Sequence, residues 1–234
     1  MLKFNDEAKK EIDKLDNPWK NATKDTKVLE VDKKIYDKLK VAWAWDNRSI
    51  DKEKKYRKEF EFPLPINGNF KKAKYLLLYS NPASESIMIS PSTKNKLLKC
   101  FKLDDDAEFV IANDDWSKFY TKELNRFFRS RDKISKEETK EFLNQFCFVN
   151  FCAYSTGINS FNFTDSQIKN EISEFTSTKF VVDLVNKWFK VKGADNIYIV
   201  RAREYVWRNN KNLFSKLNLR TLIEDGETKS SIKK

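Results

Sequence analysis

The stretch Lys74–Glu85, which reads KYLLLYSNPASE, decides how the rest of the chain folds around it. Its unbroken apolar run at 75–79 predicts a strand buried on both faces, as strands of parallel sheets are. Asn81-Pro82 ends that strand, because proline lacks an N–H and restricts the residue before it. Small and acidic side chains then follow the strand's carboxyl end, where open α/β sheets bind ligands. Taken alone, the stretch also fits a buried strand with an ordinary turn, so the other strands have to decide.

The composition indicates one sizeable folded domain, or one domain with an appendage. The chain has 234 residues, of which 40% are hydrophobic, and its 19 Phe and 6 Trp favour a packed core over disorder. The N-terminal stretch has no apolar signal region, and no apolar run approaches the length of a membrane span. We therefore expect a cytoplasmic protein without a membrane partner.

The absence of histidine restricts the chemistry. Ser-His-Asp and Cys-His catalysis are excluded, as is every zinc site that needs histidine. The three cysteines, Cys100, Cys147 and Cys152, are too few for a structural zinc and are expected to be reduced, buried thiols. We expect no metal and no cofactor, so proton transfer has to use Asp, Glu, Tyr, Lys or an ordered water.

The chain is basic, with 46 Lys and Arg against 35 Asp and Glu and a formal charge of +11. A basic surface attracts nucleic acid through its phosphates, independently of sequence. The alternative is that the lysines only reflect the composition of an AT-rich genome. The charge therefore adds modest support for a nucleic-acid partner.

Strand and helix patterns alternate along the chain. After the strand at 75–79, further strands are predicted at 108–113, 146–151 and 196–200, with helical periodicity between them, as at 93–101 and 178–190. Alternation of this kind predicts an α/β fold, a three-layer α/β/α arrangement around a central, mainly parallel four-stranded sheet. Helical patterns before the connector at 62–69 predict a helical N-terminal extension, residues 1–61, packed on an α/β domain at 62–234.

Polar residues follow each predicted strand. Asn81, Asp114, Tyr154 and Arg201 all come just after a strand's end, and parallel strands end at one edge of the sheet. We therefore expect these four residues to be neighbours.

Several short motifs near these strand ends resemble those of the uracil-DNA glycosylase superfamily, in particular its divergent bacterial branch. The motifs, in order, are the connector Pro63–Gly68, Asn81-Pro82, Ala153-Tyr154-Ser155-Thr156, Ser166-Gln167, and Arg201 with Trp207. The resemblance covers about residues 62–210 and depends on the order of the motifs, since each of them is short. It implies a uracil-DNA-glycosylase-like domain whose partner is DNA; it implies nothing about protein partners.

The resemblance implies hydrolysis of an N-glycosidic bond after the target base has flipped out of the duplex. Asn81 would hold the attacking water or contact the base. Glu85 or Asp114 would act as general base or stabilise the oxocarbenium-like transition state by its charge.

The other implied contacts are with the base and the DNA backbone. Tyr79 or Tyr154 would stack on the flipped base. Arg201 or Arg203 would stabilise the leaving base or hold a phosphate. Ser155, Ser166 and Gln167 would bind the flanking backbone, the last two at a helix N-terminus.

The chain departs from the family pattern at Ala83, where glycine is usual, and at Ala153 and Ser155/Thr156, where proline and histidine are usual. These departures argue against uracil as the base and favour a damaged or modified base in DNA repair. A bulky modified base of phage DNA is one such base and would imply antiviral defence. The alternatives are an inactive superfamily member that binds nucleic acid or a protein, and a different α/β hydrolase acting on a nucleotide or nucleoside.

Overall fold

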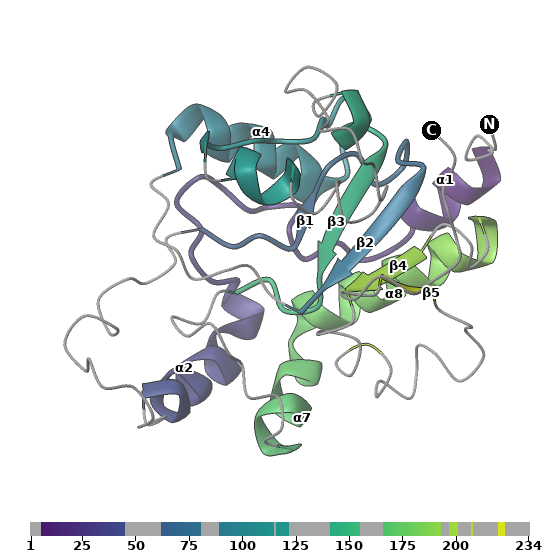
Figure 1. The fold of residues 1–234 in the computed structure, drawn as a ribbon. Coiled ribbons are helices and arrows are strands. Elements are labelled where there is room, and N and C mark those ends of the chain that lie inside the picture. The colour runs from purple at the N-terminus through teal and green to yellow at the C-terminus, as the bar shows by residue number, and fades with distance from the viewer. Residues whose placement is uncertain are drawn as a thin grey trace.

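Strand β2 (Tyr75–Tyr79) lies at the centre of the sheet (Figure 1). The computed structural model describes residues 6–44, 62–80, 89–114, 116–121, 141–154, 166–192, 197–200, 207 and 220–222. The other strands are β1 (Ile66–Asn67), β3 (Phe146–Asn150), β4 (Ile197–Val200) and β5 (Arg220–Leu222), and the order across the sheet is β1-β3-β2-β4-β5. β2 pairs in parallel with β3 and β4, and β4 with β5, whereas β1 runs antiparallel to β3.

The predicted four-stranded, mainly parallel sheet is wrong. The part built around β3 is a mixed unit, β1-β3-β2, which β4 and β5 extend on the far side of β2. The strands predicted at 75–79, 146–151 and 196–200 are present within a residue at each end. Residues 108–113 form no strand, and both β1 and β5 were absent from the prediction.

A side-chain amide holds residues 108–113 next to β1, although they are not part of the sheet. Asn67 Oδ1 accepts a hydrogen bond from the Val110 N–H, and its Nδ2 donates to the Val110 carbonyl, both at 2.9 Å. The Asn67 amide thereby replaces the backbone peptide of a neighbouring strand. Asn69 does the same for the carbonyls of Asp105 and Ala107. Because β1 runs antiparallel to β3, the segment 105–110 runs toward the carboxyl ends of β2 and β3.

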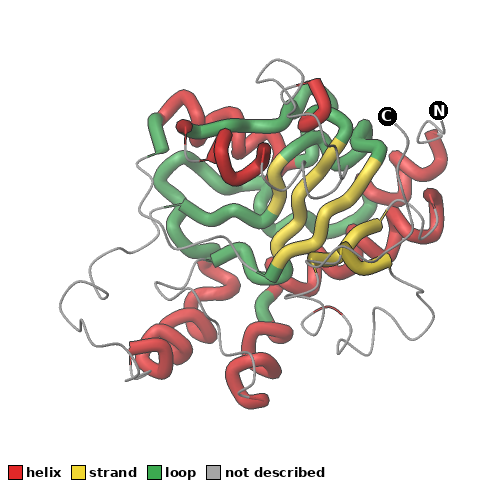
Figure 2. The backbone as a smooth tube through the Cα atoms, in the orientation of Figure 1, coloured by secondary structure: helices red, strands yellow, loops and turns green. Residues whose placement is uncertain are grey.

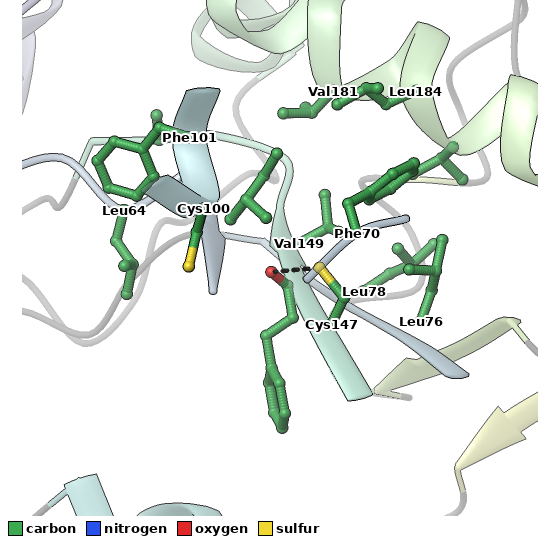
Figure 3. Packing of buried hydrophobic residues seen from close by; sticks show 14 of the residues in the cluster. Leu64, Phe70, Leu76, Leu78, Cys100, Phe101, Cys147, Val149, Val181 and Leu184 are labelled. Carbon is green, nitrogen blue, oxygen red and sulfur yellow. Dashed lines mark hydrogen bonds between the residues drawn. The ribbon is translucent and has the colours of Figure 1, made fainter. Parts of the chain in front are cut away.

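Helix α8 (Thr176–Lys192) covers one face of the sheet. Side chains alternate along a strand, so Leu76 and Leu78 of β2 share this face with Val149 of β3. Figure 3 shows Val181 and Leu184 of α8 above them, beside Phe70. Phe70 in turn meets Trp188 edge to face, with ring centroids 5.4 Å apart. This face is an aliphatic core closed by a helix.

The opposite face is aromatic and is covered by residues 109–114 and 116–121. Phe148 of β3 lies at its centre and contacts Tyr79, Phe109 and Tyr120, with ring centroids 5.4, 5.2 and 4.7 Å away. Tyr120 belongs to the helical segment 116–121 and accepts a hydrogen bond from Asn67 Nδ2 at 3.0 Å. The segment that replaces the predicted strand therefore also forms the second cover of β2 and β3.

Other helices in the described part of the chain are α1 (Asp6–Asp13), α2 (Glu30–Ala44), α4 (Pro91–Lys102) and α7 (Ser166–Glu174). Figures 1 and 2 show α2 and α7 below the sheet and not on its faces. α4 packs beside β1; Ser90 caps it by accepting from the Thr93 N–H, and Leu103 ends it at a φ of 61°. None of the described helices is long and apolar enough to cross a membrane.

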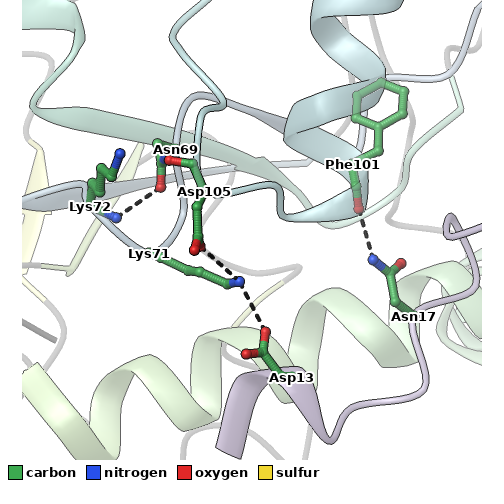
Figure 4. A network of polar contacts seen from close by, with 7 residues as sticks. All are labelled: Asp13, Asn17, Asn69, Lys71, Lys72, Phe101 and Asp105. Atoms are coloured by element: carbon green, nitrogen blue, oxygen red, sulfur yellow. Dashed lines mark hydrogen bonds and ion pairs between the residues drawn. The ribbon is translucent and has the colours of Figure 1, made fainter. Parts of the chain in front are cut away.

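The N-terminal part contributes to the same core as the rest of the chain. Ile12, Trp19 and Leu29 are all buried, and Trp19 packs against Phe101 of α4. Figure 4 shows polar contacts along this boundary, where Lys71 bridges Asp13 of α1 and Asp105 at 2.9 and 3.1 Å. Residues 6–44 are thus fixed to the sheet by apolar packing and by ion pairs.

We predict that Asn67→Ala destabilises the protein by about 2–4 kcal/mol, because it leaves the Val110 N–H and carbonyl buried without partners. Denaturant unfolding of the variant and the wild type measures the difference. Asn95→Ala, at an exposed position of α4, is the matched control and is expected to stay within about 0.5 kcal/mol. Equal stability of Asn67→Ala and wild type would show that the amide is not what holds the segment.

Candidate functional site

The carboxyl ends of β2, β3 and β4 meet at one edge of the sheet, here called the rim: Tyr79, Ser80, residues 150–154 and Val200. Tyr79 is in register with Asn150, and Leu78 with Ile199. From β2 the chain goes to β3 on one side and then to β4 on the other, so the strand order reverses at β2. In open α/β sheets ligands bind outside the strand ends at such a reversal. The fold therefore points to the residues just after Tyr79.

The backbone at the rim is tied together by hydrogen bonds. The Phe151 N–H donates to the Tyr79 carbonyl at 2.9 Å, and the Cys152 N–H donates to the Ser80 carbonyl at 2.8 Å. Trp207, which is fully buried, also donates from Nε1 to the Tyr79 carbonyl at 2.9 Å. Its burial and this bond show that Trp207 packs inside the protein at the rim. The end of β2 is thus contacted both by the residues that follow β3 and by Trp207, which follows β4 in the sequence.

Tyr79 lies where the sequence predicts, at the rim. Its ring is half-buried, stacks on Phe148 and meets the Phe119 ring at 6.1 Å. Phe119 is 44% exposed, so an aromatic surface reaches solvent at the end of β2. Whether Tyr79 contacts a base stays a prediction.

Asp114 is exposed in the first turn of the helical segment that begins there. The cap of this segment is Asn113, whose Oδ1 accepts from the Trp116 N–H at 3.0 Å. Asp114 is therefore not needed as the cap. It follows the segment that Asn69 and Asn67 direct toward the rim.

Tyr154 lies inside the core instead of facing solvent. Its hydroxyl donates to Asp32 Oδ2 at 2.8 Å and accepts from the Leu29 N–H at 3.2 Å. The ring is 3% exposed and is enclosed by Trp19, Tyr36 and Phe175. Burial, and after it the negative charge of Asp32, raise the pKa of Tyr154 well above its ordinary value. In this position the ring is not open to a flipped base.

Asp32 of α2 is a buried carboxylate that the sequence analysis did not select. It is 0% exposed and accepts hydrogen bonds from the N–H groups of Thr176 and Ser177, at 2.6 and 3.3 Å, as well as from Tyr154. Thr176 is the first residue of α8, where the helix dipole favours a negative charge. Asp32 lies in a charged stretch that reads Glu30-Val31-Asp32-Lys33-Lys34, and nothing in this sequence distinguishes it from the exposed charges around it.

Asn150 is a second rim residue that the prediction missed. It is 6% exposed; its Nδ2 donates to the Leu64 carbonyl at 2.7 Å and its N–H to the Pro65 carbonyl at 2.9 Å. The signal was present, because Asn150 is the polar residue that ends the apolar run from Phe146. It places a side-chain amide beside Tyr79.

The remaining predicted site residues cannot be located against the rim. Asn81, Glu85, Ser155, Arg201 and Arg203 lie outside the described residues. Ser166 and Gln167 are the first two residues of α7, and their side chains are outside the described set as well. The expected grouping of Asn81, Asp114, Tyr154 and Arg201 stays a prediction for the pairs that include Asn81 or Arg201.

The cysteines are unsuited to nucleophilic chemistry at neutral pH. Burial raises the pKa of Cys100 to about 11 and that of Cys152 to about 12, and it also raises the pKa of Cys147. All three thiols are free and buried. Among the described residues, no group of three or more His, Cys, Asp or Glu side chains is placed to hold a metal ion.

Comparisons of the chain with models of protein families, with curated proteins and with solved structures gave no match. The geometry of the rim and the residues that follow its strands therefore carry the functional argument.

We predict a loss of stability in alkali that depends partly on Tyr154. Because its pKa in the folded protein lies above the ordinary value of 10.0, its contribution is fully present below pH 10 and is lost as the pH rises further. Tyr154→Phe should cost about 1–3 kcal/mol at neutral pH, by leaving Asp32 short of a donor. Its stability should then fall less steeply above pH 10, by about 1.4 kcal/mol for each pH unit.

Denaturant unfolding of wild type and Tyr154→Phe between about pH 9 and about pH 11 measures the two slopes. The buried thiols and Tyr120 titrate in both proteins, so the difference isolates Tyr154. Parallel slopes would show that the Tyr154 hydroxyl ionises freely in the folded state.

Proposed function

We propose that the protein is a DNA glycosylase that hydrolyses the N-glycosidic bond of a flipped, damaged or modified base. The observation that carries the proposal is the reversal of strand order at β2, whose carboxyl end leads directly into Asn81-Pro82. This topology supports the proposal, because in open α/β sheets ligands bind beyond such a strand end, and here the residues that follow it resemble a motif of the uracil-DNA glycosylase superfamily. A modified base of phage DNA, with a role in antiviral defence, and a cytoplasmic location belong to the same proposal.

The proposed chemistry needs no histidine. As the bond between base and sugar breaks, its electron pair leaves with the base and positive charge develops on the sugar. A water molecule adds to the sugar carbon and gives up its proton, and the departing base takes up a proton. Asn81 would hold the water or the base, and the carboxylate of Glu85 or Asp114 would accept the water's proton or stabilise the sugar cation.

DNA is the proposed partner because its negatively charged phosphates attract a protein with a formal charge of +11. Arg201 or Arg203 would stabilise the leaving base or hold a phosphate. Tyr79 is the proposed stacking residue, since its ring lies at the rim whereas that of Tyr154 is enclosed. Ser155, Ser166 and Gln167 are the proposed backbone contacts.

The second candidate is an inactive relative that acts as a nucleic-acid-binding or protein-interaction module. The enclosure of Tyr154 favours it, because one of the two predicted stacking residues then has a structural role. The two candidates differ in whether the protein hydrolyses an N-glycosidic bond. A single assay for base release distinguishes them.

We predict that the wild type releases a base from at least one of a panel of duplexes carrying uracil, damaged bases or phage-type modified cytosines. Alkali cleavage of the resulting abasic sites measures the reaction. Asn81→Ala should lower the rate by at least about a hundredfold, because it removes the group that orients water or base. Asn95→Ala on α4 is the control and should keep the wild-type rate.

Two results would contradict the proposal. Absence of base release from every duplex, together with tight, salt-sensitive DNA binding, would favour the binding module. A wild-type rate in Asn81→Ala would remove Asn81 from the mechanism.

A further inference from the structure

Burying the carboxylate of Asp32 costs free energy. Its carboxylate is fully buried, and the partners that the structure describes for it are a hydroxyl and two backbone N–H groups, none of which is cationic. A buried carboxylate without a counter-ion is unfavourable unless hydrogen bonds and a local dipole compensate for the lost hydration. Here the amino end of α8 and the Tyr154 hydroxyl provide that compensation. The charge is therefore fixed in one place by groups from α8 and from the end of β3.

The hydrogen bond between Asp32 and Tyr154 joins the N-terminal part of the chain to a residue of the rim. Tyr154 is the last described residue of the exit from β3, and most of its described side-chain contacts come from the N-terminal part. Trp19 and Tyr36 contact its ring, Leu29 donates to its hydroxyl, and Asp32 accepts from it. The N-terminal part thus holds the side chain of the residue that ends the segment 151–154.

The same exit is bonded to the end of β2. Cys152 donates its N–H to the Ser80 carbonyl, and the Ala153 carbonyl accepts from the Leu64 N–H, both at 2.8 Å. Ser80 is the residue before Asn81, and Tyr154 is the residue before Ser155. A displacement of Tyr154 would therefore act on the backbone that leads into two of the proposed site residues.

We propose that Asp32 is a positioning residue for the rim: through Tyr154 it fixes the exit of β3 and, through that exit, the backbone that leads into Asn81 and Ser155. Its effect on the reaction rests on the proposed function. Asp32 touches no reacting atom and takes part in no proton transfer. The N-terminal helices would then be a part of the site's scaffold and not an accessory to it.

Tyr154→Phe is the main test, since it removes the hydroxyl bond and keeps the ring. In the full chain, amide exchange followed by mass spectrometry in peptides spanning residues 148–154 should become at least about tenfold faster. Peptides from α8 residues 180–190 should keep their protection once corrected for global stability. On the substrate identified above, kcat should fall about tenfold or more while KM changes little.

Two further variants separate positioning from stability. Asp32→Asn keeps the size of the side chain but removes the charge and one acceptor, and should change exchange and kcat in the same direction as Tyr154→Phe. Tyr120→Phe removes another fully buried hydroxyl, one bonded to Asn67, and should lower stability while leaving kcat and the exchange of residues 148–154 as in the wild type.

Unchanged exchange at residues 148–154 in Tyr154→Phe would overturn the inference, as would faster exchange with an unchanged kcat. A kcat lowered as much in Tyr120→Phe as in Tyr154→Phe would also overturn it, because the effect would then follow stability. If the wild type releases no base, the proposed function fails. The exchange comparison alone then decides whether Asp32 and Tyr154 fix the rim.

Discussion

The burial of β2 on both faces is the constraint on which the rest of the structure depends. Leu76, Leu77 and Leu78 are each 0% exposed, so neither side of this strand can face water. Two different covers meet that requirement: α8 with mainly aliphatic side chains, and residues 109–114 and 116–121 with aromatic ones. Because both faces of this strand are covered, only the residues that follow its ends are left to meet a ligand, as they do in other open α/β sheets.

The sequence predicted well the elements whose pattern is local. The run at 75–79 could only be a buried strand, and the periodicity at 178–190 identifies most of α8. The strand at 108–113 failed for a reason that lies elsewhere in the chain, since the Asn67 amide takes the place of the ladder. β1 and β5 are two and three residues long, too short to leave a pattern of alternation.

In the candidate site, too, local patterns could be predicted from the sequence and contacts with distant residues could not. Tyr79 could be assigned to the rim because its position follows from the end of a strand, and Asn150 could have been assigned on the same ground. Tyr154 also follows a strand, yet its side chain turns inward to Asp32, which lies 122 residues away in the sequence. A contact between residues so far apart leaves no trace in spacing or composition, so its direction could not be read from the motif that contains it.

The surroundings of β1 affect whether the edge of the sheet can pair with a strand of another molecule. β1 is the edge strand on its side of the sheet, and an open edge is a template for pairing with another chain. β1 is only two residues long and α4 packs beside it, so it offers an incoming strand no continuous row of backbone donors and acceptors. The segment that Asn67 and Asn69 hold next to β1 adds to this cover. The sheet therefore ends on this side in a strand that is a poor template for another chain.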